Sequence, residues 1–374
     1  MRSQPRGGSG SWQQNRGLVW VPVVLILVIT LADVMAPQDI HLGPLLIVAP
    51  ALTASFGGSR LTAAMGALAF GALLAISAAR NSIFTANHES QLMSLLLITV
   101  FTVIFTRVRE RHHAELEQVR SVAEAAQQVV LHPLPERIGA LQLASTYQAA
   151  ADQARIGGDL YAAVRARGGT RLLIGDVRGK GLGAVEDAAL LLGAFRSAAH
   201  HELPLPELQQ ELEATVAWGL AQQAGEEPFA EESFITAALI DVPDDAPVVH
   251  ILNSGHPAPL RLRCGQVDKL TPGEFAPPIG VGLAVPGAAA VDTFPFAAGD
   301  MLLLYTDGAT EARDAHGRFY PLSERLALFG ECGSPRELVA RVRDDLLDYS
   351  EGELGDDAAL VAAMRAPARP APGP

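Results

Sequence analysis

Four apolar stretches near the start of the chain constrain its fold more than any other feature. None contains Asp, Glu, Lys or Arg, and they cover Gly17–Ala32, Ile40–Ser59, Leu61–Ala79 and Ser90–Thr106. Each is close to the ~17 to 25 residues that a helix needs to cross a bilayer. A buried core helix would explain any one of them, but four in succession favour four transmembrane helices. A cleaved signal peptide fits poorly, because a second apolar stretch follows the first after a few residues.

Arginines predict how these helices are oriented. They precede the first stretch, separate the second from the third and follow the fourth, and they are Arg2, Arg6, Arg16, Arg60, Arg107, Arg109 and Arg111. The opposite side has one basic residue and three acidic ones, which are Arg80, Asp33, Asp39 and Glu89. Because positive residues stay inside, we expect a multi-pass protein of the cell membrane with both termini in the cytoplasm. The dense basic run after the fourth stretch also suits anionic lipid of the inner leaflet.

Composition excludes several classes of function. The net charge of −13 weighs against nucleic acid as a partner, since binding phosphate backbones needs clustered Lys and Arg. The two cysteines, Cys264 and Cys332, are far apart, which fits a reducing compartment and argues against a disulfide framework or a zinc ribbon. The apolar stretches hold no Asp, Glu, Lys or Arg, so a transporter or channel is disfavoured.

The pattern after the fourth stretch changes to that of a long polar helix and then a folded domain. No Gly or Pro occurs from Val108 to about Leu131, so this segment should continue the last span as a helix until Pro133 and Pro135 end it. It serves either as a simple connector or as a pairing helix of a homodimer. We divide the chain into a cytoplasmic segment (1–16), a transmembrane region (17–106), a connector helix (107–135), a folded domain (136–365) and a disordered tail (366–374).

The folded domain alternates strand-like and helix-like segments. Strand patterns cover 141–150, 171–177, 233–242, 247–255, 259–264, 301–307 and 358–364. Helix patterns cover 183–201, 207–223 and 334–349. Several strands follow one another without a helix between them, so we expect an α+β domain with antiparallel pairing and helices on the outer faces.

Acidic residues stand where predicted strands meet turns. They are Asp159 in "GGDLY", Asp176 in "GDVRGKG", Asp307 in "LLLYTDG", and the pair Asp356 and Asp357 in "GDDAALV". Each taken alone is an ordinary turn former or helix N-cap. If they converge, carboxylates without balancing cations repel one another, and the usual resolution is a divalent ion such as Mg²⁺ or Mn²⁺. Spacing along the chain does not decide between these two interpretations.

Five motifs in order resemble a known family. "GGDLY", "GDVRGKG", "NSGHPAPL", "LLLYTDGATEARD" and "GDDAALV" look like the successive motifs of the stage II sporulation protein E-like branch of the metal-dependent type 2C (PPM) protein serine/threonine phosphatases. The similarity runs from about Val122 to Met364. It implies a PPM-type α/β/β/α sandwich, in which two antiparallel sheets pack face to face between helices, for the domain over 136–365.

The resemblance also implies a site with two Mn²⁺ or Mg²⁺ ions. Asp176 matches the aspartate that bridges both metals, and the carbonyl of Val177 matches the backbone ligand beside it. Asp357 stands where relatives often carry Asn or Asp. The remaining matched ligands are Asp159, Asp307 and Asp356. A water shared by the two cations would then attack phosphorus in line, without a covalent phosphoenzyme.

The chain departs from the family pattern at two places. Relatives in the wider family carry a His two residues after the bridging Asp, thought to be a general acid, where this chain has Arg178. Arg178 is either a solvated turn residue or, together with Lys180, a group that holds the substrate phosphate. Ala162 and Ala163 follow Tyr161 where an acid is usual, which bears on the positioning of the first-motif aspartate.

Two further residues near the motifs have alternative roles. Glu311 lies one helical turn after Asp307, where it either reaches a third metal or the substrate or remains a solvated surface residue. His256 in "NSGHPAPL" is either an acid-base residue or, as its Gly-His-Pro context favours, a structural residue of a turn.

These observations predict a membrane-tethered, metal-dependent phosphatase that hydrolyses phosphoserine or phosphothreonine on a regulatory protein. The family commonly acts on proteins of the anti-sigma factor antagonist type, and this substrate class is implied by the resemblance only. The alternative is a phosphatase-like membrane scaffold that binds a phosphoprotein without hydrolysing it. Arg178 and Ala162 favour the scaffold. The Asp at every matched side-chain ligand position disfavours it.

Overall fold

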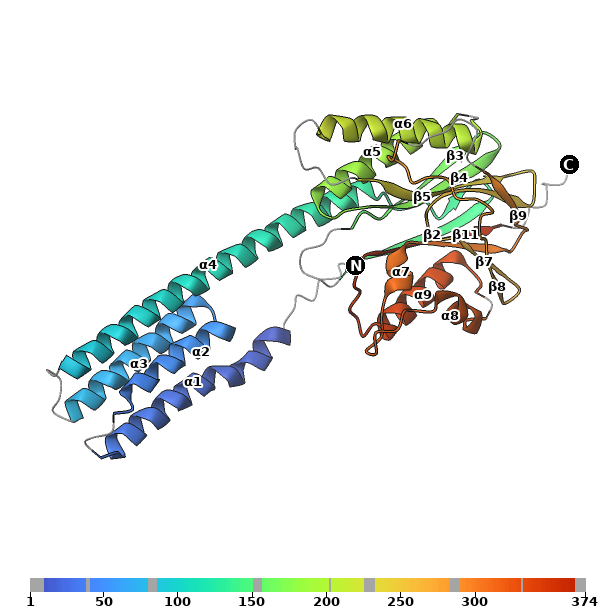
Figure 1. The fold of residues 1–374 in the computed structure, drawn as a ribbon. Helices are drawn as coiled ribbons and strands as arrows, with labels where there is room; N and C mark the ends of the chain where they lie inside the picture. The colour runs from blue at the N-terminus through green and yellow to red at the C-terminus, as the bar shows by residue number, and fades with distance from the viewer. Residues whose placement is uncertain are drawn as a thin grey trace, which may run out of the picture. The chain divides into compact units, whose positions relative to one another are not determined.

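The computed structural model describes residues 10–37, 41–79, 86–150, 157–201, 203–224, 233–282, 290–330 and 332–366 (Figure 1). The chain forms two compact units, Met1–Leu116 and Glu117–Pro374, and each is described by itself. Some predictions fall outside the described residues. These concern the segment 1–9, the tail from 367 onward, and Asp39 and Arg80 in the orientation argument.

The first unit is a bundle of apolar helices. Its elements are α1 (Gly10–Met35), η1 (Gly43–Ile47), α2 (Val48–Phe56), α3 (Ser59–Ala79) and the first part of α4 (Ala86–Val130). Within the described residues, three helical segments are long and apolar enough to cross a membrane, namely Gly17–Met35, Ser59–Ala79 and His88–Leu116. The apolar stretch predicted as the second span forms the shorter pair η1 and α2 over Gly43–Phe56. Pro44 lies in the first turn of η1, and Gly57 ends α2 in an extended conformation, which together limit the helix length.

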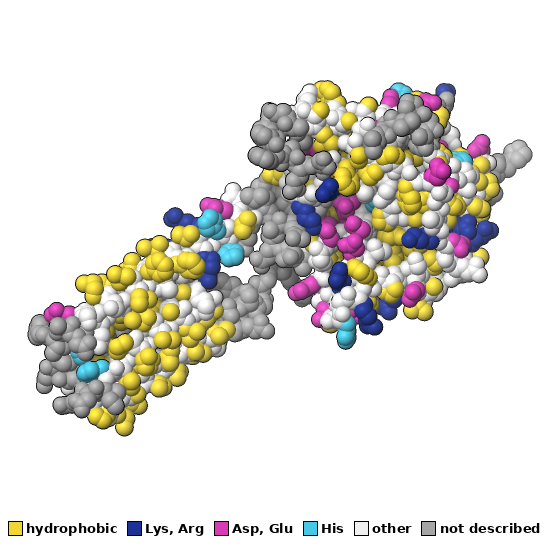
Figure 2. All heavy atoms as spheres, viewed as in Figure 1, with side chains coloured by type: hydrophobic (Ala, Val, Ile, Leu, Met, Phe, Trp, Pro, Cys, Tyr) yellow, Lys and Arg dark blue, Asp and Glu magenta, His cyan; other side chains and the backbone are white. Residues whose placement is uncertain are grey.

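Small residues and outward-facing apolar side chains characterise this bundle. A Cβ added to Gly66 on α3 would lie 2.1 Å from Cγ2 of Thr99 on α4, so these two helices approach closely, as small residues allow in membranes. The large side chains of Trp20, Leu27 and Phe101 are exposed. Figure 2 shows hydrophobic side chains covering the visible face of these helices. Such a surface is suited to lipid.

α4 is one continuous helix of 45 residues, so the last apolar segment and the connector expected after it share a single helix. The helix ends at Val130, just before Pro133 and Pro135. Prolines cannot continue a helical hydrogen-bond pattern, which accounts for the end.

The second unit contains two antiparallel sheets. One has the strand order β1-β2-β11-β10-β7-β8 and the other β3-β4-β5-β6-β9. The first sheet is formed by Arg137–Ile138, Leu141–Gln148, Ala358–Arg365, Met301–Tyr305, Leu260–Arg263 and Gln266–Lys269, in that order. The second is formed by Leu160–Ala166, Gly169–Val177, Ile235–Pro243, Val248–Ser254 and Asp292–Pro295.

Helices cover the outer faces of both sheets. α5 (Leu182–Ala198) and α6 (Leu205–Ala224) lie over the β3–β4–β5 sheet, and α7 (Asp307–Glu311), α8 (Leu322–Leu328) and α9 (Pro335–Tyr349) lie on the side of the other sheet (Figure 1). This arrangement confirms the predicted α/β/β/α sandwich.

The strand that leads to Asp307 shows how the layers are held together. Leu302 and Leu304 of β10 belong to the core between the sheets, whereas Met301, Leu303 and Tyr305 belong to the core under α8 and α9. Successive side chains of a strand point to opposite faces, so a strand buried on both faces must be apolar throughout. Because both faces of "MLLLY" are packed, the end of β10 is fixed in position, and so is Asp307 two residues after it.

Candidate active site

Both sheets deliver acidic residues to the same end of the sandwich. Asp159 precedes β3 and Asp176 lies near the end of the paired strand β4, where Leu160 is the register partner of Gly175. Asp307 follows β10, and Asp356 precedes β11, which pairs with β10. Figure 2 shows acidic side chains gathered in one place on the second unit, with basic side chains beside them. The structure thus brings together the aspartates that the sequence analysis singled out.

Two glycines allow the strand ends to approach this closely. A Cβ on Gly158 would lie 2.5 Å from the carbonyl oxygen of Val177, and a Cβ on Gly308 would lie 1.9 Å from the carbonyl oxygen of Asp357. Real Cβ atoms do not come this close to backbone. The glycines beside Asp159 and Asp307 are therefore needed for close backbone approach, not only for turning.

Asp159 is the most deeply buried of the matched ligands. It is 3% exposed and accepts a hydrogen bond from Thr306 Oγ1 at 2.7 Å. The same Thr306 oxygen accepts from the backbone N–H of Ala359 at 2.9 Å, so the hydroxyl links the two sheets. Burial, followed by the charge of Asp176, raises the pKa of Asp159 well above its usual range.

Asp176 and Asp307 share this unfavourable electrostatic environment. Burial raises the pKa of Asp176 to about 7, and the charges of Asp307 and Asp356 add to the effect. Burial also raises the pKa of Asp307, with further contributions from Glu311 and Asp356. A hard divalent cation would relieve the repulsion, and an all-oxygen donor set is the one that Mg²⁺ and Mn²⁺ prefer. The residues present therefore fit such an ion chemically.

Asp356 and Asp357 have different surroundings from the other three. Asp356 pairs with Lys180, whose Nζ lies 2.8 Å from Oδ2. Asp357 is buried and accepts from the backbone N–H groups of Ala150 at 2.6 Å and Gly157 at 2.5 Å, and from the hydroxyl of Tyr147. Asp357 thus fixes the backbone at Ala150 and at Gly157, next to the first motif, through hydrogen bonds.

The carboxylate side chains of the described residues do not form a complete set of ligands around one point. Across the described ranges, no three Asp, Glu, His or Cys side chains stand close enough to hold one ion as they lie. Asp356 would have to exchange Lys180 for a cation. Of the two groups predicted to bind phosphate, Arg178 lines the pocket described next, whereas Lys180 is paired with an acid and is not part of that lining.

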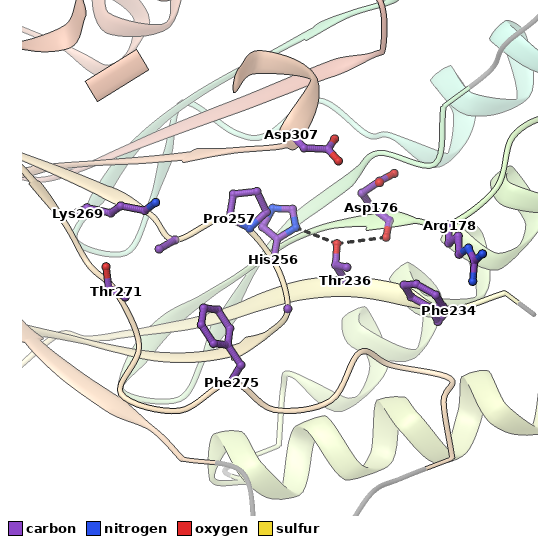
Figure 3. Close-up of a pocket in the computed structure, with 12 residues that line it drawn as sticks. Asp176, Arg178, Phe234, Thr236, His256, Pro257, Lys269, Thr271, Phe275 and Asp307 are labelled. Carbon is purple, nitrogen blue, oxygen red and sulfur yellow. Dashed lines mark hydrogen bonds between the residues drawn. The ribbon is translucent and has the colours of Figure 1, made fainter. Parts of the chain in front are cut away.

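A pocket of about 650 Å³ opens beside Asp176 and Asp307 (Figure 3). Arg178 lines it with its guanidinium carbon 5.1 Å from the ring centroid of Phe234, and Arg178 itself is exposed. The lining also includes Lys269, Thr271 and Phe275, which sequence reasoning missed. The sequence held one signal for Lys269: it and Lys180 are the only lysines of the chain, so each lysine could have been considered as a site residue.

His256 sits in the floor of this pocket as a buried, neutral group. It is 2% exposed, and burial lowers its pKa to about 3. Its Nδ1 lies 3.3 Å from Thr236 Oγ1, which in turn donates to the carbonyl of Asp176 at 3.5 Å (Figure 3). The side chain of Asn253 accepts from the His256 N–H and donates to its carbonyl. This setting fits the structural interpretation of His256.

Glu311, at the end of α7, is exposed. It influences Asp307 through its charge, because it is among the causes of the raised pKa of that carboxyl group. This position fits the interpretation of Glu311 as a solvated surface residue.

Comparison with known proteins adds to this geometry. The sequence model of the stage II sporulation protein E (SpoIIE) family matches residues 166–366, more than half of the chain. A curated relative, the phosphoserine phosphatase RsbU of Bacillus subtilis (strain 168), is 35% identical over 68 residues, which is 18% of this chain and 20% of that protein. The chain therefore matches about a fifth of the length of this relative.

Solved structures share the fold. The RsbU and RsbW domains of Rv1364c from Mycobacterium tuberculosis are 22% identical with a TM-score of 0.51, and the match covers 64% of this chain and 62% of that one. The SiaA-PP2C domain of Pseudomonas aeruginosa is 18% identical with a TM-score of 0.52, and the match covers 68% of this chain and 99% of that one.

Proposed function

Because the chain belongs to the SpoIIE family, we propose that it is a metal-dependent protein serine/threonine phosphatase tethered to a membrane. The observation that carries the proposal is the convergence of Asp159, Asp176 and Asp307 from two sheets, each with a raised pKa. Carboxylates so arranged are costly unless they bind cations. The curated relative is itself a phosphoserine phosphatase.

The proposed ligands of two Mn²⁺ or Mg²⁺ ions are Asp159, Asp176, Asp307 and Asp356, with the backbone carbonyl of Val177. Divalent cations at such a site lower the pKa of bound water and neutralise charge on a phosphoryl group. The chain supplies the rest: the sheets hold the carboxylates in place, and Thr306 keeps Asp159 oriented through its hydroxyl.

Arg178 and Lys180 have distinct proposed roles. Arg178, exposed at the pocket and stacked on Phe234, presents its guanidinium to the substrate phosphate. Lys180 balances the charge of Asp356, and it would be available to the phosphate if that carboxylate held a cation instead. His256 is neutral and buried, so it does not serve as an imidazolium acid, and we assign protonation of the leaving serine or threonine oxygen to water.

The substrate that we propose is a phosphorylated regulatory protein of the anti-sigma factor antagonist type, as the family resemblance implies. We further propose that the enzyme resides in the cell membrane with its phosphatase unit in the cytoplasm; the apolar helical segments of the first unit and the positions of the arginines support this. The connector in α4 is proposed to pair with a second copy of the chain.

The test is hydrolysis of a phosphoserine peptide by the full chain in detergent micelles, with and without Mn²⁺. We expect activity that needs the metal and falls about 100-fold or more in Asp176→Asn and in Asp307→Asn. Arg343→Met, a change of a partly exposed residue on α9, is the control and should keep full activity.

The second candidate is the non-catalytic scaffold. The Lys180–Asp356 pair favours it, because a lysine occupies one proposed metal ligand. A folded wild-type chain that binds phosphoprotein but releases no phosphate with any divalent metal would establish the scaffold instead of the phosphatase.

A further inference from the structure

The pocket beside Asp176 and Asp307 contains a basic group that the proposed chemistry does not use. Lys269, the last residue of β8, lines this pocket. Within the described part of the chain, no carboxylate pairs with its ammonium group, whereas the other lysine, Lys180, is bonded to Asp356. An ammonium that faces a pocket without a protein partner is available to a ligand.

The backbone holds Lys269 firmly in this position. Its register partner is Leu260 on β7, and the next residue, Leu270, donates its N–H to the carbonyl of Pro259 at 2.8 Å. The preceding residue, Asp268, pairs with Arg261 at 2.6 Å. Neighbouring side chains of a strand point to opposite faces, so Asp268 is directed away from Lys269.

Lys269 and Arg178 lie on different sides of the carboxylates. Figure 3 shows Arg178 with Phe234 on one side of the pocket and Lys269 with Thr271 on the other, with His256 and Pro257 between them. Arg178 follows Asp176 closely in sequence and suits the phosphate itself. Lys269 is therefore placed for a different group of the same substrate.

The size and lining of the pocket suit a peptide. A volume of about 650 Å³ falls in the range of ligand sites and admits a few residues of extended chain, each rising ~3.3 Å. Phe275 contributes an aromatic ring that is 57% exposed, which offers an apolar contact beside the two polar groups.

We propose that Lys269 and Thr271 form a subsite for the carboxylate of an Asp or Glu of the protein substrate, close in sequence to the phosphorylated residue. The ammonium of Lys269 pairs with the carboxylate, the hydroxyl of Thr271 donates to it, and Phe275 packs against an adjacent apolar side chain. This subsite rests on the proposed function, because it takes the phosphorylated residue to lie at Asp176 and Asp307.

The first experiment compares pairs of phosphoserine peptides that carry Glu or Gln at one of the three positions on either side. With the full chain in detergent and Mn²⁺, we expect one position at which the Glu peptide has about fivefold higher kcat/KM, mainly through KM. In Lys269→Met, the Glu and Gln peptides should have equal kcat/KM. In Lys269→Glu, a third peptide with Lys at that position should have a higher kcat/KM than the Glu peptide. Arg343→Met removes one positive charge from α9 and should keep the ratio.

A binding measurement separates this proposal from the phosphatase proposal. Fluorescence anisotropy of the same labelled peptides is recorded on the Asp307→Asn chain, with and without Lys269→Met. If the Glu peptide binds more tightly and this preference depends on Lys269, the subsite proposal stands. If the wild-type chain at the same time hydrolyses no peptide, the phosphatase proposal is rejected. Equal handling of Glu and Gln peptides at every position, or a Glu preference that survives Lys269→Met, would overturn the subsite. A peptide with a second phosphoserine preferred over both would show a phosphate subsite instead.

Discussion

Without a cation, the carboxylates of Asp159, Asp176 and Asp307 repel neighbouring acidic groups. The pKa of Asp176 is about 7 instead of 3.8, because burial and the charges of Asp307 and Asp356 oppose its ionisation. Asp159 is shifted in the same direction. Folding therefore brings carboxylates to a place where ionising them costs free energy, and the unfolded chain has no such cost.

Stability of the metal-free protein should fall as pH rises. Because the folded pKa lies above the unfolded one, the folded state binds more protons between pH ~4 and ~7, and its stability decreases across that window. In EDTA, the midpoint of thermal unfolding at pH 5 should exceed that at pH 8 by ~2 to 4 °C. Asp176→Asn should flatten the dependence. A higher midpoint at pH 8 in wild type would contradict the shift.

A methyl group at Gly308 should disrupt the site. In Gly308→Ala the Cβ would lie 1.9 Å from the carbonyl oxygen of Asp357, so the two strand ends must separate. We expect a loss of ~2 kcal/mol or more, with loss of phosphatase activity. The matched control is Gly193→Ala in the middle of α5, where an added Cβ would meet open space among the described residues and a gain of ~0.5 to 1 kcal/mol is expected. Thermal unfolding and peptide hydrolysis measure both variants, and equal stability of the two would refute the close approach.

At the level of elements, the end of α4 is bonded to the loop that carries the first motif. The side-chain amide of Gln127 is 6% exposed and donates to the hydroxyl of Tyr147 at 2.8 Å and to the carbonyl of Gly157 at 3.1 Å. Tyr147 donates in turn to Asp357. A short chain of hydrogen bonds thus joins the connector helix to Asp357 and to Gly157, which lies two residues before the candidate metal ligand Asp159.

Removal of the Gln127 amide should loosen the first motif. Gln127→Ala leaves the carbonyl of Gly157 without this donor, at a cost of ~1 to 3 kcal/mol for a buried polar group. We expect a lower unfolding temperature and a several-fold higher Mn²⁺ concentration for half-maximal hydrolysis. Gln118→Ala, exposed on the same helix, is the control and should change neither quantity. An unchanged Mn²⁺ requirement in Gln127→Ala would show that the contact is structural only.

At the scale of the whole molecule, the short pair η1 and α2 matters for membrane topology. Among the residues that the structure describes, three helical segments are long enough to cross; if all three cross, both termini share one side only if Gly43–Phe56 crosses as well. The arginines before the first stretch and after the fourth favour that outcome.

Labelling with a membrane-impermeant maleimide tests this topology. Cys264 is exposed and should react only after cells are permeabilised, since we place its unit in the cytoplasm. In a chain with both native cysteines replaced by Ala, Ser3→Cys should behave in the same way. If the cysteine at position 3 reacts in intact cells while Cys264 stays protected, the chain crosses the membrane an odd number of times.

The sequence alone was sufficient for features that depend on local composition. Uncharged stretches predicted apolar helices, and apolar strands such as β10 and β11 were recognisable because both faces are buried. The order of five motifs was sufficient for the two-sheet fold, which the structure confirms. Locally weak elements escaped prediction: β3 is rich in Ala, and β8, β9, α7 and α8 are short.

Tertiary structure decided what depends on distances between segments remote in sequence. Sequence spacing left open whether the aspartates meet, and only the packing of two sheets brings Asp159 and Asp176 toward Asp307. The pairing of Lys180 with Asp356, 176 residues away, and the presence of Lys269 in the pocket follow from the same packing. The physical reason is that side-chain periodicity reports the local environment of each strand, whereas the register and stacking of whole sheets determine which strand ends become neighbours.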